Sequence, residues 1–414
     1  MRSRFVSRDV RHDAKCEHRH GMNLTAEQHL HIQNNREAAL RIRANRDQYF
    51  GAAGVASDLP CGLRVPLFPH DWTPVISFTL KPPLNFGESF RLPKHSRRLL
   101  AFVHQHPRDT RVQFFEEPHV YEIDGVPTLG SVTGLIHAFA EVFDSDLVIS
   151  KMTSGPNWPR PGYMKAPVPE WVLEELRLHP AGAALLQTLL DHPADEQTIA
   201  AEAAVLCFES PGLKTLIDGL ALSPEEIKAK WQANGGEAAN RGTWMHYSFE
   251  LHLNRELLMD ESREFQLFLQ FLSTLTGYTA YRTEWWIFAD KERLAGSIDF
   301  AATDARGELL LIDWKRAKNI SQKYSNKFRR MKQPLNHLDD ISGCHYRLQL
   351  NCYKFIIENY YGMAVSKMLV VCTHPDNGPT AFVDHVPCLE KETTLLMDWQ
   401  RNRALLSATK SATI

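Results

Sequence analysis

The chain lacks patterned cysteine, long apolar runs and strong net charge, and each absence narrows what it can be. Its seven cysteines form no Cys-x-x-Cys pair, which disfavours a structural zinc site, and their odd number indicates free thiols in a reducing compartment. It has no run of about 18 apolar residues and no signal-peptide core, so we expect no contact with a membrane. The formal net charge of −2 argues against a protein that coats nucleic acid over its whole surface.

The composition divides the 414 residues into three parts. Residues 1–50 are a polar tail, and residues 51–108 hold eight of the 23 prolines without clear periodicity, which indicates a linker or an irregular wrap. Residues 109–414 are long enough for the main folded unit. Within that unit, residues 144–238 combine a proline-rich loop with helical segments and are predicted to form a helical insertion.

An ordered set of polar groups runs through the middle of the main unit: His246, Asp299, Asp313 and Lys315. Carboxylate and imidazole are ligands for a hard or borderline divalent ion, and lysine supplies a cation. Hydrolysis of a phosphodiester needs a metal that offsets developing negative charge and activates water. The set therefore suits a metal held against a phosphodiester.

Strand periodicity makes the convergence of these groups plausible. Residues 308–315 are an apolar run that turns polar at its end, as a buried strand does where it reaches a site. Side chains alternate along a strand, so Asp313 and Lys315 are predicted to project to one face and Trp314 to the other. Residues 294–304 also indicate a strand, and a hairpin between the two would place Asp299 beside Asp313.

Helices are predicted on both sides of this hairpin. The upstream one places His246 and Glu250 one turn apart, and the downstream one does the same for Gln349 and Tyr353. Taken singly, each residue has an ordinary explanation, such as a core histidine or the polar edge of an amphipathic helix. Glu250 and Glu284 are weaker candidates, because a solvated helix face or strand edge explains them equally well. The ordered combination is what favours a catalytic site.

Asp299 followed by Asp313-Trp314-Lys315 resembles the motif of the PD-(D/E)XK nuclease superfamily. The His246 motif before it and the Gln349…Tyr353 motif after it resemble the RecB-like exonuclease branch, which includes the mitochondrial genome maintenance exonuclease. The resemblance covers roughly residues 110–390. It implies an α/β fold with an αβββαβ core and a helical insertion.

The resemblance also assigns roles. It implies that Mg²⁺ or Mn²⁺ is bound by His246, Asp299, Asp313 and the backbone carbonyl of Trp314. Lys315 would orient or deprotonate the attacking water and offset charge. The remaining two motif residues, Gln349 and Tyr353, would position the phosphate and the strand being cut. Several relatives carry an iron–sulfur cluster on four cysteines, but the scattered cysteines of this chain predict none.

Positive charge is concentrated directly after the predicted catalytic strand. Residues 315–332 hold eight Lys or Arg and no acid. We expect this segment to contact the phosphates of bound DNA through six of its basic side chains: Arg316, Lys318, Lys323, Lys327, Arg329 and Arg330. A solvated, mobile loop is the alternative explanation of the same charges.

The N-terminal tail carries a separate motif. Residues 24–44 are predicted to form a helix with an apolar stripe along one face. Because the tail alone cannot bury this stripe, we expect the helix to dock on a partner. The motif resembles the replication protein A-binding motif of annealing helicases at Leu24, Glu27, Gln28, Ile32, Asn35, Arg36, Leu40 and Arg43. An ordinary amphipathic helix is the alternative. The resemblance implies a nuclear protein, although the Arg-rich first 23 residues leave a mitochondrial address as the second possibility.

The sequence as a whole predicts a metal-dependent deoxyribonuclease acting on single-stranded or flap DNA, with replication protein A as a partner. Two other functions stay open. One is a non-cleaving adaptor that binds single strands, and the other is an RNase or a sequence-specific endonuclease on the same core. Occupied catalytic positions disfavour the adaptor, and the lack of a base-reading module disfavours sequence specificity.

Overall fold

The computed structural model describes residues 99–411 apart from 156, 257–259 and 325–328, together with positions 62–65, 83, 86–87, 90 and 92. Contacts divide the chain into two compact units, residues 1–57 and 58–414. The predicted partner-binding helix at 24–44 lies outside the described residues. The helices and strands of the described residues all belong to the second unit.

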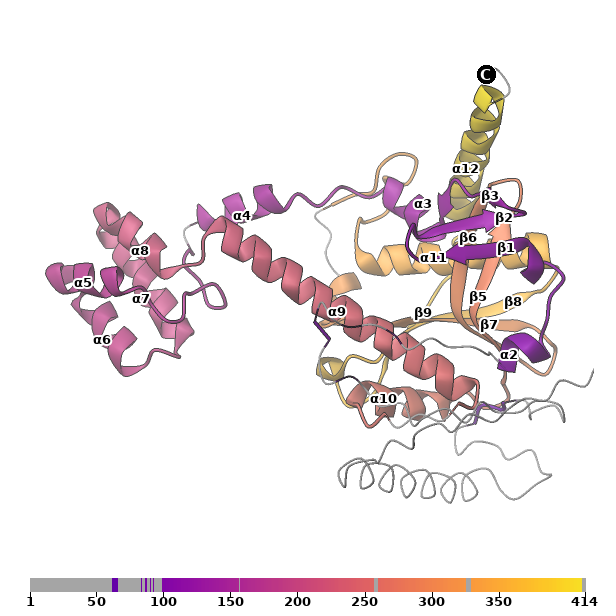
Figure 1. Ribbon diagram of the computed structural model, residues 1–414, viewed down its shortest axis with the longest axis horizontal. Helices are drawn as coiled ribbons and strands as arrows, with labels where there is room; N and C mark the ends of the chain where they lie inside the picture. The colour runs from indigo at the N-terminus through magenta and orange to yellow at the C-terminus, as the bar shows by residue number, and fades with distance from the viewer. Residues whose placement is uncertain are drawn as a thin grey trace, which may run out of the picture. The chain divides into compact units, whose positions relative to one another are not determined.

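Six strands of the described chain form one mixed sheet (Figure 1). Its members are β4 (Gly130–Ser131), β5 (Thr279–Ala289), β6 (Leu294–Thr303), β7 (Leu309–Lys315), β8 (Val365–Cys372) and β9 (Phe382–His385). The strands follow the order β4-β6-β7-β8-β9, and β5 pairs with β6. β6 is antiparallel to both β5 and β7, whereas β7 and β8 run parallel. A helix must therefore connect β7 to β8.

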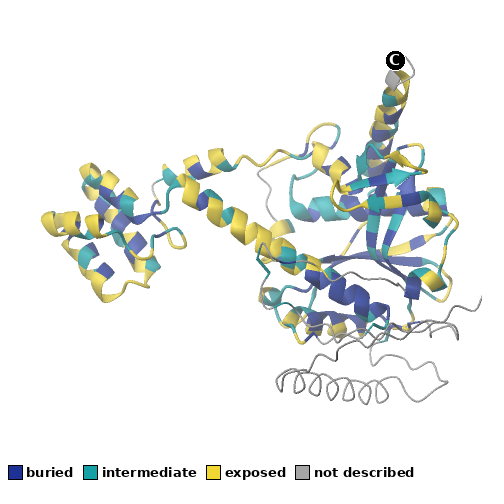
Figure 2. Ribbon diagram, viewed as in Figure 1, coloured by how far each residue is buried: buried dark blue, intermediate teal, exposed yellow. Residues whose placement is uncertain are grey.

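Helices cover both faces of this sheet. The core on one face is formed with α3 (Val132–Ala138), α11 (Ser342–Ile356), a π-helical turn (Ile357–Tyr361) and α12 (Glu390–Ser411). The other face packs on α9 (Pro224–Leu253) and α10 (Arg263–Leu272), whose stacked Phe249 and Phe268 contact Trp314 of β7. Figure 2 shows the strands buried between these helices. The α/β class predicted from the sequence is confirmed.

The predicted hairpin is present. The bounds of β6 and β7 differ from those of the predicted strands by no more than one or two residues. Gly307, with a φ of 78°, lies in the turn between them. Along the chain α9, β5, β6, β7, α11 and β8 follow one another, with α10 added between α9 and β5. In this order α11 follows the polar end of β7, and the His246 helix precedes the first long strand with α10 between them.

Two devices fix the ends of α9. Ser223 caps its start, with Pro224 in the first turn and Glu226 completing a capping box. At its end, Asn254 donates a side-chain hydrogen bond to Thr283 Oγ1 of β5 (2.8 Å) and accepts one from the backbone N–H of Leu100 (2.9 Å). The C-terminal half of α9 is thereby tied to β5.

The predicted insertion is helical, with its own small core. It contains α4 (Ser145–Thr153), α5 (Glu170–Leu178), α6 (Ala183–Asp191), α7 (Glu196–Glu209) and α8 (Lys214–Leu220). The predicted bound of the insertion at residue 238 does not coincide with a helix end. Instead α9 continues without a break from Pro224 through the His246 motif.

A short helix and a second, small sheet lie before the insertion. α2 spans Leu99–Val103, and a three-stranded sheet joins β1 (Val112–Phe115), β2 (Val120–Ile123) and β3 (Val126–Pro127). Arg64 exchanges backbone hydrogen bonds with the start of β5, so part of the predicted wrap contacts the core. No helix among the described residues combines the length and apolar character needed to cross a membrane.

Candidate active site

Asp299 and Asp313 stand side by side on β6 and β7, as the hairpin predicted. The register pairs Phe300 with Ile312, so the next residues toward the polar end of β7 are these two acids. The backbone N–H of Trp314 donates a 2.8 Å hydrogen bond to Asp299 Oδ2. Both carboxylates are shielded from solvent, with side-chain exposures of 11 % for Asp299 and 2 % for Asp313.

A third carboxylate continues this row onto β5. Thr283 pairs with Phe300, so Glu284 stands opposite Asp299. Its Oε2 accepts a hydrogen bond from Ser297 Oγ (3.0 Å). Three neighbouring strands therefore each present a carboxylate at the same level of the sheet. Like charges placed opposite one another destabilise a sheet, so this arrangement calls for a compensating cation.

His246 approaches the row from α9. Its Nδ1 lies 3.6 Å from Glu284 Oε1 and 3.6 Å from Asp299 Oδ2. Burial lowers the pKa of His246, but the Asp299 and Glu284 carboxylates outweigh burial and raise it to about 9. Burial also raises the pKa of Asp299 to about 7, with Asp313 and Glu284 adding to the effect against His246. Without a metal, the imidazolium is the cation that holds these acids together.

These three side chains fit a divalent ion. Among the described residues, His246, Glu284 and Asp299 offer ligand atoms that all lie within 4.8 Å of one another. Ligands bonded to one ion at about 2.1 Å are roughly 3–4 Å apart, which matches the distances from Nδ1. Carboxylates suit Mg²⁺ and Mn²⁺, and the imidazole shifts the preference toward Mn²⁺. Metal binding would require His246 to lose its proton.

Lys315 projects to the same face as Asp313, as the strand alternation predicted. Its Nζ lies 2.7 Å from Asp313 Oδ2 and 4.9 Å from the centre of the Tyr346 ring. Burial lowers the pKa of Lys315, but Asp313 and Asp299 outweigh burial and hold it above its usual value. The ammonium form is therefore favoured, which suits charge compensation and orientation of water. Of the two roles predicted for this lysine, deprotonation of water is disfavoured.

Gln349 and Tyr353 reach the site from α11, but both are buried, with exposures of 8 % and 3 %. Gln349 Nε2 donates hydrogen bonds to Asp313 Oδ1 (3.1 Å) and to Tyr353 Oη (3.0 Å). The ring of Tyr353 fills the space beside Gly296 of β6, where an added Cβ would lie 2.7 Å from it. The geometry makes this pair a support for Asp313. Direct contact of Tyr353 with DNA, which the sequence predicted, is not favoured by this burial.

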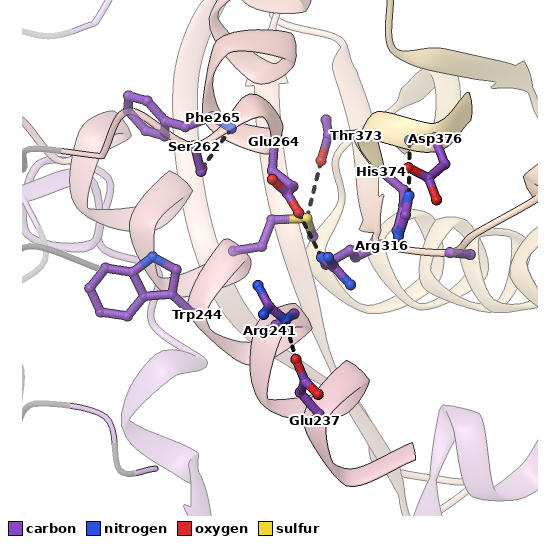
Figure 3. A network of polar contacts seen from close by, with 12 residues as sticks. Glu237, Arg241, Trp244, Ser262, Glu264, Phe265, Arg316, Thr373, His374 and Asp376 are labelled. Atoms are coloured by element: carbon purple, nitrogen blue, oxygen red, sulfur yellow. Dashed lines mark hydrogen bonds and ion pairs between the residues drawn. The ribbon is translucent and has the colours of Figure 1, made fainter. Parts of the chain in front are cut away.

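The basic segment after β7 is less free than the sequence indicated. Arg316 forms an ion pair with Glu264 of α10 at 2.9 Å (Figure 3). Lys318 pairs with Asp376 at 3.0 Å. Similarly, Arg330 lies 2.7 Å from Asp339, and Arg329 lies 3.9 Å from Asp340. Lys323 is exposed, whereas Lys327 lies outside the described residues. DNA contact by this segment stays a prediction.

The predicted set thus converges in large part. His246, Asp299, Asp313, Lys315 and Gln349 come together from α9, strands β6 and β7, and α11. Trp314 contributes its N–H, and the role predicted for its carbonyl stays a prediction.

Three further residues border the site. Glu284 was only a weak candidate in the sequence, and Tyr346 and Tyr121 carried no signal there. Burial, with the Glu284 and Asp299 carboxylates, raises the pKa of Tyr121 to about 12. These residues are found only through strand register and tertiary packing.

No protein-family model matches the chain, and its sequence matches none of the curated proteins. The resemblance to RecB-like nucleases therefore depends on the motif residues.

Proposed function

We propose that this protein is a metal-dependent nuclease that hydrolyses phosphodiester bonds of single-stranded DNA, at ends or flaps. The observation that carries the proposal is the convergence of His246, Asp299, Asp313 and Lys315 at the polar end of β7. Two acids, an imidazole and an ammonium group from separate elements are more than a structural ion pair requires. The order α9, β5, β6, β7, α11, β8 supports the same conclusion, because it follows the αβββαβ core that the motif implies.

The divalent ion would be held by His246 and Asp299, with Asp313 beside it, and would supply charge compensation and a lowered pKa for water. Lys315 would face the same phosphate and offset the negative charge that grows on its oxygens. Overall, the water oxygen bonds to phosphorus, the phosphorus–oxygen ester bond breaks, and the departing oxygen ends with a proton. Asp313 keeps Lys315 in place through their ion pair.

Gln349 and Tyr353 would act as positioning residues in this scheme. Gln349 holds Oδ1 of Asp313, which leaves Oδ2 for Lys315. Both are fixed by α11, which packs on β7 and β8. A site placed on rigid elements keeps the geometry that phosphoryl transfer needs.

The experiment is digestion of end-labelled DNA by the full chain. Single-stranded, duplex and flap substrates, labelled at either the 5′ or the 3′ end, are incubated with Mg²⁺, with Mn²⁺ or with EDTA. We expect single-stranded and flap DNA to be cut with either metal and not with EDTA, and Asp299→Asn to abolish cutting. Product ladders give the polarity and separate exonuclease from endonuclease action.

Two arms test the alternatives. A single-stranded RNA of the same sequence is cut more slowly than DNA if the proposal holds. An adaptor would bind the labelled strand in a gel-shift assay without cutting it in any metal. Binding without cleavage by well-folded protein would replace the proposal.

Residues 24–44 would recruit this activity to DNA coated by replication protein A, in the nucleus. Such a helix would raise the local concentration of the nuclease without a tight contact at the active site. The test is a pull-down of replication protein A with the full chain and with Ile32→Asp, Leu40→Asp. Equal recovery by both would dispose of this recruitment.

A further inference from the structure

Glu284 occupies an unusual backbone conformation in the middle of a long strand. Its φ is 42°, in the left-handed region that non-glycine residues rarely adopt. Such strain costs on the order of 1–3 kcal/mol and persists where the surroundings fix it, often at functional sites. The residues around it are firmly held: Thr283 and Trp285 are buried, and Thr283 bonds to the end of α9. The backbone therefore aims this one carboxylate out of the regular strand pattern.

The Glu284 carboxylate points toward His246. Ser297 Oγ holds Glu284 Oε2 at 3.0 Å, and Oε1 faces His246 Nδ1 at 3.6 Å. Asp299, directly across the strand pair, presents Oδ2 to the same nitrogen at the same distance. A separation of 3.6 Å exceeds a normal N–H···O hydrogen bond and is short enough for both atoms to bind one ion.

The charges in the row are unequally compensated. Asp313 forms an ion pair with Lys315 through Oδ2 and accepts a hydrogen bond from Gln349 at Oδ1. Glu284 and Asp299 instead share a single imidazole as the positive group that faces them both.

We propose that Glu284 is a direct ligand of the divalent ion and completes a centre with His246 and Asp299. This inference rests on the proposed function only in that both place a metal at Asp299 of β6. Asp313, which pairs with Lys315, lies beside this centre, and its own binding of the ion stays a prediction. The strained backbone at Glu284 is then the cost of bringing a third ligand from β5 to the ion.

Metal binding tests this without reference to DNA cleavage. Mn²⁺ is titrated calorimetrically into the full chain, into Glu284→Gln and into Glu116→Gln, an exposed acid of the turn after β1. We expect Glu284→Gln to weaken Mn²⁺ at least about tenfold, since even indirect supports of a ligand contribute 10–100-fold. Glu116→Gln should bind as wild type does. Equal affinities of Glu284→Gln and wild type would overturn the proposal.

Thermal unfolding separates ligation from a structural role. Metal-free Glu284→Gln loses both the repulsion of Asp299 and the attraction of His246, so it should unfold close to the wild-type temperature. Added Mn²⁺ should then raise the unfolding temperature of wild type and not of the variant. A metal-free variant that unfolds well below wild type, while keeping the Mn²⁺-induced rise, would show a structural role and overturn the proposal.

A thiolate at this position reports contact with the ion directly. Glu284→Cys loaded with Cd²⁺ should show a sulfur-to-metal charge-transfer absorption, because thiolates bind soft ions strongly. Glu116→Cys carries the same number of thiols and should lack this band. It is the control for any absorption that comes from Cd²⁺ bound to the native cysteines. No difference between the two spectra would refute direct ligation.

These outcomes are distinct from failure of the nuclease proposal. If Glu284→Gln loses Mn²⁺ but wild type cuts no DNA, the metal centre stands and the nuclease function does not. If wild type cuts DNA and Glu284→Gln binds Mn²⁺ normally, the nuclease function stands and the ligand assignment does not. Failure of the wild type to bind any Mn²⁺ would remove both.

Discussion

Lys315 Nζ and Asp313 Oδ2 form an ion pair at 2.7 Å in which Asp313 is almost fully buried. A buried pair contributes little to stability as a whole, but removing one partner leaves an uncompensated charge. Since Asp313 is also held by Gln349, the pair fixes Lys315 at the end of β7. The Lys315 side chain, 20 % exposed, is the member of the pair that a substrate could reach.

Lys315→Ala is expected to lower kcat for DNA cleavage by about 10²–10³-fold, the loss typical when one preorganised charge-stabilising group is removed. Mn²⁺ affinity should stay within a few-fold of wild type, because the lysine is not a ligand. Steady-state kinetics and calorimetry measure the two quantities. Lys367→Ala, an exposed lysine on the adjacent strand β8, is the matched control and should cut DNA normally. Full activity in Lys315→Ala would refute its role.

The loss of activity can be separated from any loss of stability. Lys315→Ala should destabilise the fold, because the Asp313 carboxylate is left without its cation. The double variant Lys315→Ala, Asp313→Asn should recover stability in urea unfolding but not activity. Recovery of both would mean that Lys315 acts only on the fold.

Gln349→Leu is expected to lower kcat about 10–100-fold with little change in KM, because it removes the hydrogen bond that orients Asp313. Tyr353→Phe removes only the hydroxyl that accepts from Gln349, and should cost less than Gln349→Leu. Measuring kcat and KM for both variants on one single-stranded substrate decides this. A rise in KM alone would instead indicate that Gln349 contacts the DNA.

Sequence patterns predicted the β6–β7 half of the site because its geometry is local. An apolar run, a short turn and alternation are enough to put Asp299 beside Asp313 and to send Trp314 to the other face. Glu284 was underrated because its place depends on the β5–β6 register and on a left-handed backbone at one residue. Neither is visible in residue types alone.

Other differences have similar causes. The insertion was predicted to end at residue 238, yet α9 runs without a break through Gly235, Gly236 and the His246 motif. Its capped start and its packed C-terminal half override their low helix propensity. The basic segment seemed free because its acidic partners, such as Glu264 and Asp376, are distant in sequence.

Gly343 of α11 should be intolerant of a side chain, because an added Cβ would lie 2.4 Å from Cδ1 of Tyr324. That ring ends the 3-10 helix Ile320–Tyr324 in the basic segment and also contacts Phe382. Gly343→Ala is expected to lower the free energy of unfolding by about 1–3 kcal/mol, as overpacking does. Gly235→Ala, also within a helix but with open space at its Cβ, should be neutral or stabilising.

Urea unfolding measures both variants. If Tyr324 is the cause, Tyr324→Ala should remove most of the penalty of Gly343→Ala in the double variant, as expected for residues in contact. Strict additivity of the two changes would contradict this packing. The same variants report on the basic segment, since Gly343→Ala should weaken binding of single-stranded DNA more than Gly235→Ala does.

His252 should make the protein acid-sensitive. Its ring packs edge-on against Phe265 and Phe268, and among the described residues Nε2 is buried without a hydrogen-bond partner. Burial, assisted by Arg255, lowers the pKa of His252 to about 4. Because the unfolded chain takes up this proton near pH 6.5 and the folded chain only near pH 4, stability falls as the pH drops through that window. The full loss is on the order of 3 kcal/mol, and almost none of it occurs well above pH 6.5.

The test compares urea unfolding at about pH 7 and about pH 4.5 in wild type and in His252→Leu, two values that bracket most of this window. Carboxylates elsewhere titrate equally in both proteins, so their difference isolates the histidine. We expect the variant to lose less stability than wild type between the two pH values. His192→Leu, which removes an exposed histidine, should keep the wild-type profile. Equal losses of unfolding free energy in wild type and His252→Leu would show that His252 does not cause the acid sensitivity.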